Sequence, residues 1–432
     1  MIEIQRHASD ALLAVERGRS LTPTLAALWA SHPGLTAAQR GAIQDLAFGS
    51  CRWRGSLHAI LAALLHKPVT DAALQALLLV ALYQLQYTRA APYAVVDSAV
   101  RACALVGQPG AKGLVNALLR NFLRLRESLA ERARATEQGR FSYPQWWIDA
   151  VRAAWPLRYE SVLDAGNGHP PMTLRVNRRR IEPDAYATLL HTEGIAAQRT
   201  GPVALRLEQP VPVQRLPGFA EGLASVQDLG AQFAAPLLDL RAGQRVLDAC
   251  SAPGGKTAHL LESCDVQLLA LDQDSGRLER VGQNLARLGL HGTLRAADAG
   301  ALDRWWDGVP FDRILLDAPC TASGVVRRHP DSKWLRRPGD VEQLAREQVR
   351  LLRAVWQTLA PGGKLLFVTC SLFPAETHLQ VDAFLADHGD AVRLPLRDFP
   401  QPSGQLLPDA GHDGFFYALL QARPAGAGDH AH

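Results

Sequence analysis

The sequence predicts three successive domains: an all-helical domain over residues 1–140, a small α+β domain over 141–232 and an α/β domain over 233–432. Three observations support this division. Apolar residues recur at helical spacing up to about residue 126, strand and helix patterns are mixed over residues 143–226, and strands alternate regularly with helices from residue 227. A chain of 432 residues is long enough to bury two or three cores.

The first domain shows helical spacing clearly at the apolar positions 74, 77, 78, 81, 82 and 85. We expect six or seven helices, followed over the charged residues 127–140 by a linker that could be partly helical. Residues 1–140 carry 16 Lys and Arg against nine Asp and Glu. This excess indicates a polyanionic partner or merely a solvated basic surface, and both readings stay open.

The second domain has strand patterns at residues 172–177 and near 203–207, with a helix pattern between them at 184–193. We expect a small α+β module of the RRM or ferredoxin-like type. Arg175 and Asn177 alternate with apolar neighbours and precede three arginines, residues 178–180. Such a cluster suits RNA phosphates or the protection of an edge strand, and we favour RNA.

In the third domain, strand patterns alternate with helix patterns such as 275–288 and 340–359. This alternation predicts a doubly wound parallel sheet of the Rossmann-like class. Its candidate strands are 245–250, 266–272, 293–298, 311–317, 364–370 and 415–420.

The stretch VLDACSAPGGKT, residues 246–257, is a strand that runs into a Pro-Gly-Gly turn. Glycines let the backbone approach a ligand closely, so we expect a cofactor loop formed by Cys250, Ser251, Ala252, Pro253, Gly254, Gly255 and Lys256. A nucleotide P-loop is excluded because Cys250 stands where its first glycine is required. The alternative is an ordinary strand-to-helix turn.

Four aspartates, Asp248, Asp272, Asp298 and Asp317, each close one predicted strand. Carboxyl ends of parallel strands share one edge of a sheet, so these side chains should gather around the loop, although any single one could be a turn or cap residue. Asp272 has the spacing of an acid that binds ribose, and Asp298 could orient an adenine. Because G-x-G-x-x-G is absent, S-adenosyl-L-methionine fits better than NAD.

Cys320 lies just beyond the fourth predicted strand and Cys370 at the end of the fifth, so both should lie near Asp317. A thiolate that adds to C6 of cytosine activates C5 for methylation, and Asp317 could hydrogen-bond N3 during this step. The target base must leave its stack. Chemistry alone does not decide which thiol adds and which assists release, and both could instead be small buried apolar residues.

Composition excludes several classes of protein. No apolar run approaches the roughly 18 residues of a membrane span, and the amino terminus lacks the features of a signal peptide, so we expect a cytoplasmic protein without membrane contact. The six cysteines contain no C-x-x-C pair, so we expect neither a metal site nor disulfides. Residues 423–432 are rich in Gly and Ala and should be disordered.

Several motifs resemble those of the RNA cytosine-5 methyltransferases of the Sun/NOL/NSUN family. They are VLDACSAPGGKT, LDQD, RILLDAPCTASGVVRRHPD, KWLRR, FVTCSLFPAET, PPMTLRVN and DGFFYALL. The front resembles NusB-like RNA-binding domains through QRHASDALLAV, YAVVDSAV and KGLVNALLRNFLR. Ser251 and Thr321 stand where the family more often has Ala and Ser, and neither change removes a required group.

The resemblance implies methylation of a cytosine in 16S ribosomal RNA, naked or in an early assembly intermediate, by a protein that acts as a monomer. It assigns the nucleophile to Cys370, release of the adduct to Cys320, and catalytic or cofactor roles to Lys256, Asp272, Asp298 and Asp317. It also suggests RNA contacts by Arg327, Arg328, His329 and Lys333. A transfer-RNA methyltransferase and a non-catalytic RNA-binding factor are the alternatives.

Overall fold

The computed structural model describes residues 1–424, and these divide into two compact units. The first comprises residues 1–169 with 326–338, and the second comprises 170–325 with the described residues from 339 onward. The chain therefore leaves the second unit after Val325 and returns to it at Gly339. The tail predicted to be disordered lies outside the described residues, apart from Arg423 and Pro424.

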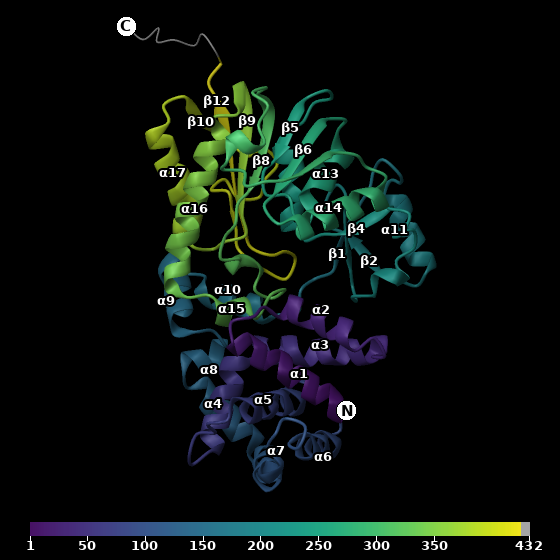
Figure 1. Cartoon of the computed structure of the whole chain (residues 1–432), viewed down its shortest axis with the longest axis vertical. Helices are drawn as coiled ribbons and strands as arrows, with labels where there is room; N and C mark the ends of the chain where they lie inside the picture. The colour runs from purple at the N-terminus through teal and green to yellow at the C-terminus, as the bar shows by residue number, and fades with distance from the viewer. Residues whose placement is uncertain (425–432) are drawn as a thin grey trace. The chain divides into compact units, whose positions relative to one another are not determined.

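The first unit is helical, as predicted (Figure 1). Its core is apolar side chains from helices α1 to α7. The helices are α1 Ile2–Glu16, α2 Leu21–Ser31, α3 Ala37–Arg52, α4 Arg54–Leu64, α5 Ala72–Tyr87, α6 Pro92–Ala102, α7 Lys112–Arg134, α8 Glu137–Phe141, α9 Gln145–Ala154, α10 Tyr159–Asn167 and α15 Ser332–Leu335, with a 3-10 turn, η1, at Pro109–Ala111.

Residues 127–140, predicted as a linker that could be partly helical, are helical over 127–134 and 137–140. Helix α7 continues through them to Arg134, after non-helical dihedrals at Leu125, and Leu129 and Ala133 are buried in the helical core. The sparse apolar residues of this stretch are spaced so that they face one side of the helix, which the low overall hydropathy concealed. Helices α9 and α10, assigned to the middle domain from the sequence, also belong to this unit.

Residues 326–338 complete the helical unit although they lie far along the chain. The Asp331 carboxylate accepts the Leu21 backbone N–H at the start of α2, at 2.9 Å, and the Trp334 indole donates to the Cys51 carbonyl at 2.7 Å. The fully buried Lys333 ammonium donates to the Arg52 carbonyl at 2.9 Å and to Asn167 at 2.7 Å.

Lys333 also lies over the Tyr143 ring, 3.9 Å from its centroid. Arg327 is buried as well, and its carbonyl accepts a hydrogen bond from Arg52 at 2.9 Å. The expected RNA contacts of Lys333 and Arg327 do not fit this arrangement, because a buried side chain presents no surface to a phosphate. These two residues belong to the core of the helical unit instead.

The second unit begins with the expected small α+β module. Helix α11 (Pro183–Thr192) packs on a four-stranded antiparallel sheet in the order β2-β3-β1-β4. Residues 173–176 alternate in the sheet between a face that packs on α11 and a face that turns to the neighbouring helices. The strands are β1 Thr173–Val176, β2 Ala197–Arg199, β3 Ala204–Leu207 and β4 Ala224–Val226, and a 3-10 turn, η2, covers Val213–Arg215.

The remainder of the second unit is an α/β sheet in the order β10-β12-β9-β8-β5-β6-β7, with β11 paired to β12. Strands β7, β6, β5, β8 and β9 are parallel, whereas β12 is antiparallel to β9 and β10 is antiparallel to β12. The predicted parallel sheet is therefore mixed at one side. The strands are β5 Arg245–Asp248, β6 Gln267–Asp272, β7 Thr293–Ala296, β8 Phe311–Asp317, β9 Leu359–Thr369, β10 Ala391–Leu394, β11 Gln405–Leu406 and β12 Phe415–Ala422.

Helices cover both faces of this sheet (Figure 1). Val246, Leu315 and Leu366 pack with α13 and α14, whereas Leu247 and Ile314 pack with α16 and α17 on the opposite face. Successive strand residues point to opposite faces, so each strand contributes to both cores. The helices are α12 Ala234–Leu237, α13 Gly255–Ser263, α14 Ser275–Leu288, α16 Pro338–Trp356 and α17 His378–Asp387, with 3-10 turns η3 Gly230–Phe233, η4 Leu302–Arg304, η5 Ser323–Val325 and η6 Pro374–Glu376.

Within residues 1–424, no helix is long and apolar enough to cross a membrane. The same residues contain no group of three or more His, Cys, Asp or Glu side chains placed to hold a metal ion.

Candidate active site

The glycine turn connects β5 to α13 at the carboxyl edge of the parallel strands. Gly254 has φ +94°, a conformation that side-chain-bearing residues rarely adopt, and its N–H donates to the Ser251 carbonyl at 2.7 Å. The Ser251 N–H in turn donates to the carbonyl of Leu271 on the neighbouring β6 at 2.8 Å. The turn is thus held in shape by its own backbone and by the next strand.

Asp248 stabilises this turn through a hydrogen bond to Thr257. Its carboxylate is buried and accepts the Thr257 hydroxyl at 2.6 Å, which connects the end of β5 to the first turn of α13. Burial raises the pKa of Asp248 to about 7, and the Thr257 hydrogen bond partly opposes this rise. Asp248 therefore supports the loop from within the core.

Asp272, at the end of β6, lies beside the same turn. One carboxylate oxygen accepts the Ala252 N–H at 3.1 Å and the other accepts the Asp274 N–H at 3.0 Å. Each carboxylate oxygen has more than one lone pair, so both can still accept a hydroxyl hydrogen bond. The glycine turn and this acid together fit a ligand that carries a ribose.

Asp298 lies two residues beyond the end of β7, where the sequence predicted continued strand. Its carboxylate accepts the Gly300 N–H and the Arg350 guanidinium, both at 2.8 Å. The Arg350 hydrogen bond is the main reason that the pKa of Asp298 is lowered. Arg350, which the sequence did not single out, thus keeps this acid charged and fixes its position.

Lys256 and Asp317 form an ion pair between the cofactor loop and the end of β8, with 2.6 Å between Nζ and Oδ2. The ammonium also lies 5.3 Å from the centroid of the Phe415 ring. Burial alone would lower the pKa of Lys256, but the charge and hydrogen bond of Asp317, with smaller contributions from Cys370 and Asp248, raise it. The lysine is therefore held as a cation beside the predicted N3 partner.

Cys320 and Cys370 lie together, with 3.3 Å between their sulfur atoms. They follow β8 and β9, which are adjacent parallel strands. The hydrogen bond between the two thiols, burial, and the nearby charges of Cys370 and Glu376 hold the pKa of Cys320 well above its usual value. Cys250 differs from these two cysteines in its position, because its side chain packs against the apolar core on the α16 side of the sheet. Burial, with nearby carboxylates, raises the pKa of its thiol as well.

Glu376, in the 3-10 turn after β9, is a residue that the sequence reasoning missed. Its fully buried carboxylate accepts the Thr321 N–H at 2.8 Å, the Thr321 hydroxyl at 2.5 Å and the Ser371 hydroxyl at 2.5 Å. Thr321 follows Cys320 and Ser371 follows Cys370. One carboxylate therefore ties together the two loops that carry the thiols. In the sequence, the only sign of a role for Glu376 is its position six residues after Cys370, inside the motif FVTCSLFPAET.

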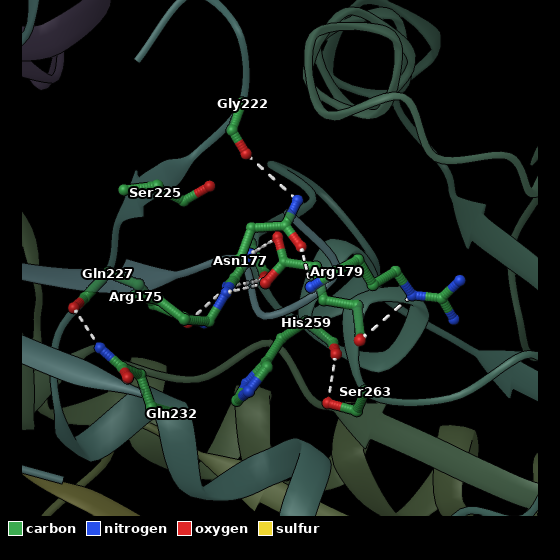
Figure 2. A network of polar contacts seen from close by, with 12 residues as sticks. Arg175, Asn177, Arg179, Gly222, Ser225, Gln227, Gln232, His259 and Ser263 are labelled. Atoms are coloured by element: carbon green, nitrogen blue, oxygen red, sulfur yellow. Dashed lines mark hydrogen bonds and ion pairs between the residues drawn. The ribbon is translucent and has the colours of Figure 1, made fainter. Parts of the chain in front are cut away.

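Arg175 and Asn177 are buried in the second unit rather than exposed to RNA (Figure 2). Arg175 pairs with Glu262, and the Asn177 side chain donates to the Gly222 carbonyl at 3.1 Å. Their expected RNA contacts therefore do not fit the structure, because β1 turns Arg175 toward α13 and the Asn177 side chain bonds to the backbone at Gly222 and Arg179. His329 is exposed and Arg328 is half-buried, and their RNA contacts stay predictions.

Comparisons with known proteins assign families to all three parts of the chain. The family described as 16S rRNA methyltransferase RsmB/F matches residues 235–421, the ferredoxin-like domain of RsmF/B-like methyltransferases matches residues 143–214, and the NusB family matches residues 3–124. These matches agree with the three predicted fold types: NusB-like, ferredoxin-like and methyltransferase.

Among solved structures, the chain resembles a methyltransferase homolog protein from Pyrococcus horikoshii, with a TM-score of 0.59 and 29% identity over 66% of this chain and 97% of that one. It also shares its fold with NSun6 from Pyrococcus horikoshii, solved with SFG, with a TM-score of 0.57 and 21% identity over 65% of this chain and 98% of that one.

Among curated relatives, the chain is 48% identical to ribosomal RNA small subunit methyltransferase B of Pseudomonas syringae, over 88% of this chain and 89% of that one. It is 47% identical to the protein of the same name from Pseudomonas putida, over 96% and 97%, and 42% identical to that of Vibrio cholerae, over 97% and 98%. With identity this high over nearly its whole length, the chain belongs to the family of the ribosomal RNA small subunit methyltransferases B.

Proposed function

We propose that this protein transfers a methyl group from S-adenosyl-L-methionine to C5 of a cytosine in 16S ribosomal RNA, through a covalent bond between Cys370 and C6 of the base. The observation that carries the proposal is the pair of thiols 3.3 Å apart, at the carboxyl edge that also presents the Lys256 and Asp317 pair. The names of the relatives support the choice of 16S RNA.

The residues present fit the proposed cofactor. Asp272 would accept hydrogen bonds from ribose hydroxyls, Asp298 would face the adenine, and the turn from Cys250 to Lys256 would surround the rest. The fold-level relative solved with SFG is consistent with a ligand site in this fold. When bound, S-adenosyl-L-methionine supplies an electrophilic methyl group on its sulfonium.

The side chains of the site can carry out the remaining chemistry. The Cys370 thiolate forms a bond to C6, and the electrons of the C5–C6 double bond shift so that C5 becomes nucleophilic. N3 takes a proton from the Lys256 ammonium through the Asp317 carboxylate that is paired with it. After C5 has taken the methyl group, N3 returns its proton to the Asp317 and Lys256 pair, and Cys320, as a thiolate, removes the C5 proton. The electrons of that C–H bond restore the double bond, the C6–S bond breaks, and Cys370 leaves as a thiolate.

The charges around the two thiols favour this order of roles. The hydrogen bond to Cys370, burial and the nearby charges of Cys370 and Glu376 raise the pKa of Cys320, so a thiolate formed at this position is a strong base. Cys370 lies close enough to Lys256 for its charge to contribute to the raised pKa of that lysine. The two thiols therefore have different charged neighbours, which supports giving them different roles.

Incubation of the protein with methyl-labelled S-adenosyl-L-methionine and protein-free 16S RNA tests the proposal. We expect label in 5-methylcytosine. Label confined to adenine or to the protein would overturn the reaction, and label in transfer RNA but not in 16S RNA would overturn the substrate.

The two cysteine variants test the roles of the thiols. Cys370→Ala should form no covalent RNA adduct, whereas Cys320→Ala should form the adduct and release it slowly, so that the adduct accumulates on denaturing gels. The opposite pattern would make Cys320 the nucleophile.

A further inference from the structure

Arg175 lies inside the second unit, on strand β1 of the small α+β module, and its guanidinium reaches helix α13 (Figure 2). The side chain is fully buried. Helix α13 begins at Gly255, so the last two residues of the cofactor loop, Gly255 and Lys256, form the start of this helix. A single side chain therefore connects the module to the element that ends the loop.

All three nitrogen atoms of this guanidinium donate hydrogen bonds. Nε and Nη2 donate to the two Glu262 carboxylate oxygens at 2.7 and 2.8 Å, while Nη1 donates to the Gln227 side chain at 2.5 Å and to the Gly255 carbonyl at 2.7 Å. The bidentate geometry is one that lysine cannot reproduce. Arg175 thus forms hydrogen bonds with α13 at its first residue, Gly255, and near its last, at Glu262.

Position 262 is seven residues after position 255, which places both groups on the same face of the helix, two turns apart. Helical side chains lean toward the amino end, so the Glu262 carboxylate comes back toward the Gly255 carbonyl. This is why one guanidinium can contact both. Removal of either Arg175 or Glu262 alone would leave the charge of the other buried and uncompensated.

Neighbouring arginines attach the same module to the carboxyl ends of two helices. Arg179 donates to the Glu262 carbonyl at 3.2 Å, at the end of α13, and Arg180 donates to the Leu288 carbonyl at 2.9 Å, at the end of α14. Helix carboxyl ends favour cations. The module therefore contacts α13 and α14 at several points, but only Arg175 among these three reaches Gly255, a residue of the cofactor loop.

We propose that Arg175 is a positioning residue through which the small α+β module holds the cofactor loop in the shape that binds S-adenosyl-L-methionine. The module then sets cofactor affinity in addition to any contact with RNA. This inference rests on the proposed function, because it assumes that the loop binds that cofactor.

Isothermal titration of the full chain with S-adenosyl-L-methionine, without RNA, tests the inference. Arg175→Lys keeps the charge and loses the fork, and the loss of one charge-assisted hydrogen bond to the loop corresponds to about tenfold weaker binding. The matched control is Arg199→Lys, in the same module, where the arginine forms an exposed ion pair with Asp184. The control should leave the affinity unchanged.

A second variant separates positioning from folding. Arg175→Met with Glu262→Met replaces the buried pair by apolar side chains of similar size, a change that proteins often tolerate, but it removes the hydrogen bond to Gly255. We expect a thermal midpoint near that of the wild type, RNA affinity near that of the wild type, and about tenfold weaker cofactor binding.

Three outcomes are distinguishable. If wild-type protein does not bind S-adenosyl-L-methionine, the proposed function fails. If wild-type protein binds it and both Arg175 variants bind it equally well, the inference fails while the function stands. If Arg175→Lys unfolds, the double methionine variant decides, and wild-type cofactor affinity in that folded variant overturns the inference.

Discussion

Replacement of Glu376 by glutamine should disturb the catalytic centre more than its small chemical size suggests. The carboxylate accepts three short hydrogen bonds from Thr321 and Ser371, the residues that follow the two cysteines. A glutamine amide keeps one accepting oxygen and replaces the other with a donor. The backbone N–H of Thr321 cannot turn away, so the amide oxygen must face it and the NH2 group must face the two hydroxyls.

The loss of stability in Glu376→Gln can be estimated from the hydrogen bonds that change at position 376. The hydroxyls can rotate to accept from the amide, so no donor is left buried without a partner, but the charge-assisted character of the bonds is lost at a cost of about 2 kcal/mol. For a unit of this size, the thermal midpoint falls by about 2–4 °C for each kcal/mol, which predicts a fall of about 4–8 °C. A displacement of the thiols by about 1 Å would lower kcat by about 100-fold.

Thermal unfolding and the rate of methyl transfer, measured on Glu376→Gln, test these figures. The control is Glu279→Gln on the exposed face of α14, which should change neither. A third measurement is the pH dependence of alkylation at Cys320, because removal of the neighbouring negative charge should lower the pKa of that thiol. Wild-type kcat with a wild-type thermal midpoint in Glu376→Gln would show that the carboxylate does not hold the two loops.

Three further results are expected. Burial, with the charge of Arg52, lowers the pKa of Lys333, so the unfolded chain binds more protons and thermal stability should rise as pH increases toward the ordinary lysine pKa of about 10.4. Lys333→Met should remove the contribution of Lys333 to this rise, and an unchanged dependence of the thermal midpoint on pH would contradict this cause. Burial, followed by the charge of Arg175, lowers the pKa of His259, so stability should fall as pH drops below about 6.5, and less so in His259→Gln, as a thermal melt at pH 5 would measure. Arg350→Met should release Asp298 and weaken binding of S-adenosyl-L-methionine up to about tenfold by titration; equal affinity would remove Asp298 from the cofactor site.

The residues at the strand ends could be predicted because their signals are local. An apolar run that stops at Asp248 or Asp317 and meets a glycine turn or a cysteine has one simple placement in an α/β sheet, the carboxyl edge. The structure places Lys256, Asp317, Cys320 and Cys370 there. Their assigned roles are proposals, but their proximity followed from the order of strands and helices.

The misplaced residues share a different property. Arg175, Arg327 and Lys333 are charged, and charge alone predicts exposure and a polyanionic partner. Each is instead buried among partners distant in the sequence, such as Glu262 for Arg175 and Asn167 for Lys333. No local pattern shows a contact across 87 or 166 residues. The antiparallel placement of β12 was missed for a similar reason, since the pattern of a buried strand does not give its direction.

The split of the helical unit along the chain has a consequence for biosynthesis. A ribosome that has released residues 1–169 has made all of the unit's long helices, but not the segment that supplies Asp331, Lys333 and Trp334. Until residue 338 emerges, the start of α2 and the Cys51 and Arg52 carbonyls lack these partners. The first part of the protein to be translated can therefore finish folding only after most of the second part has been made, which reverses the usual order in which domains mature.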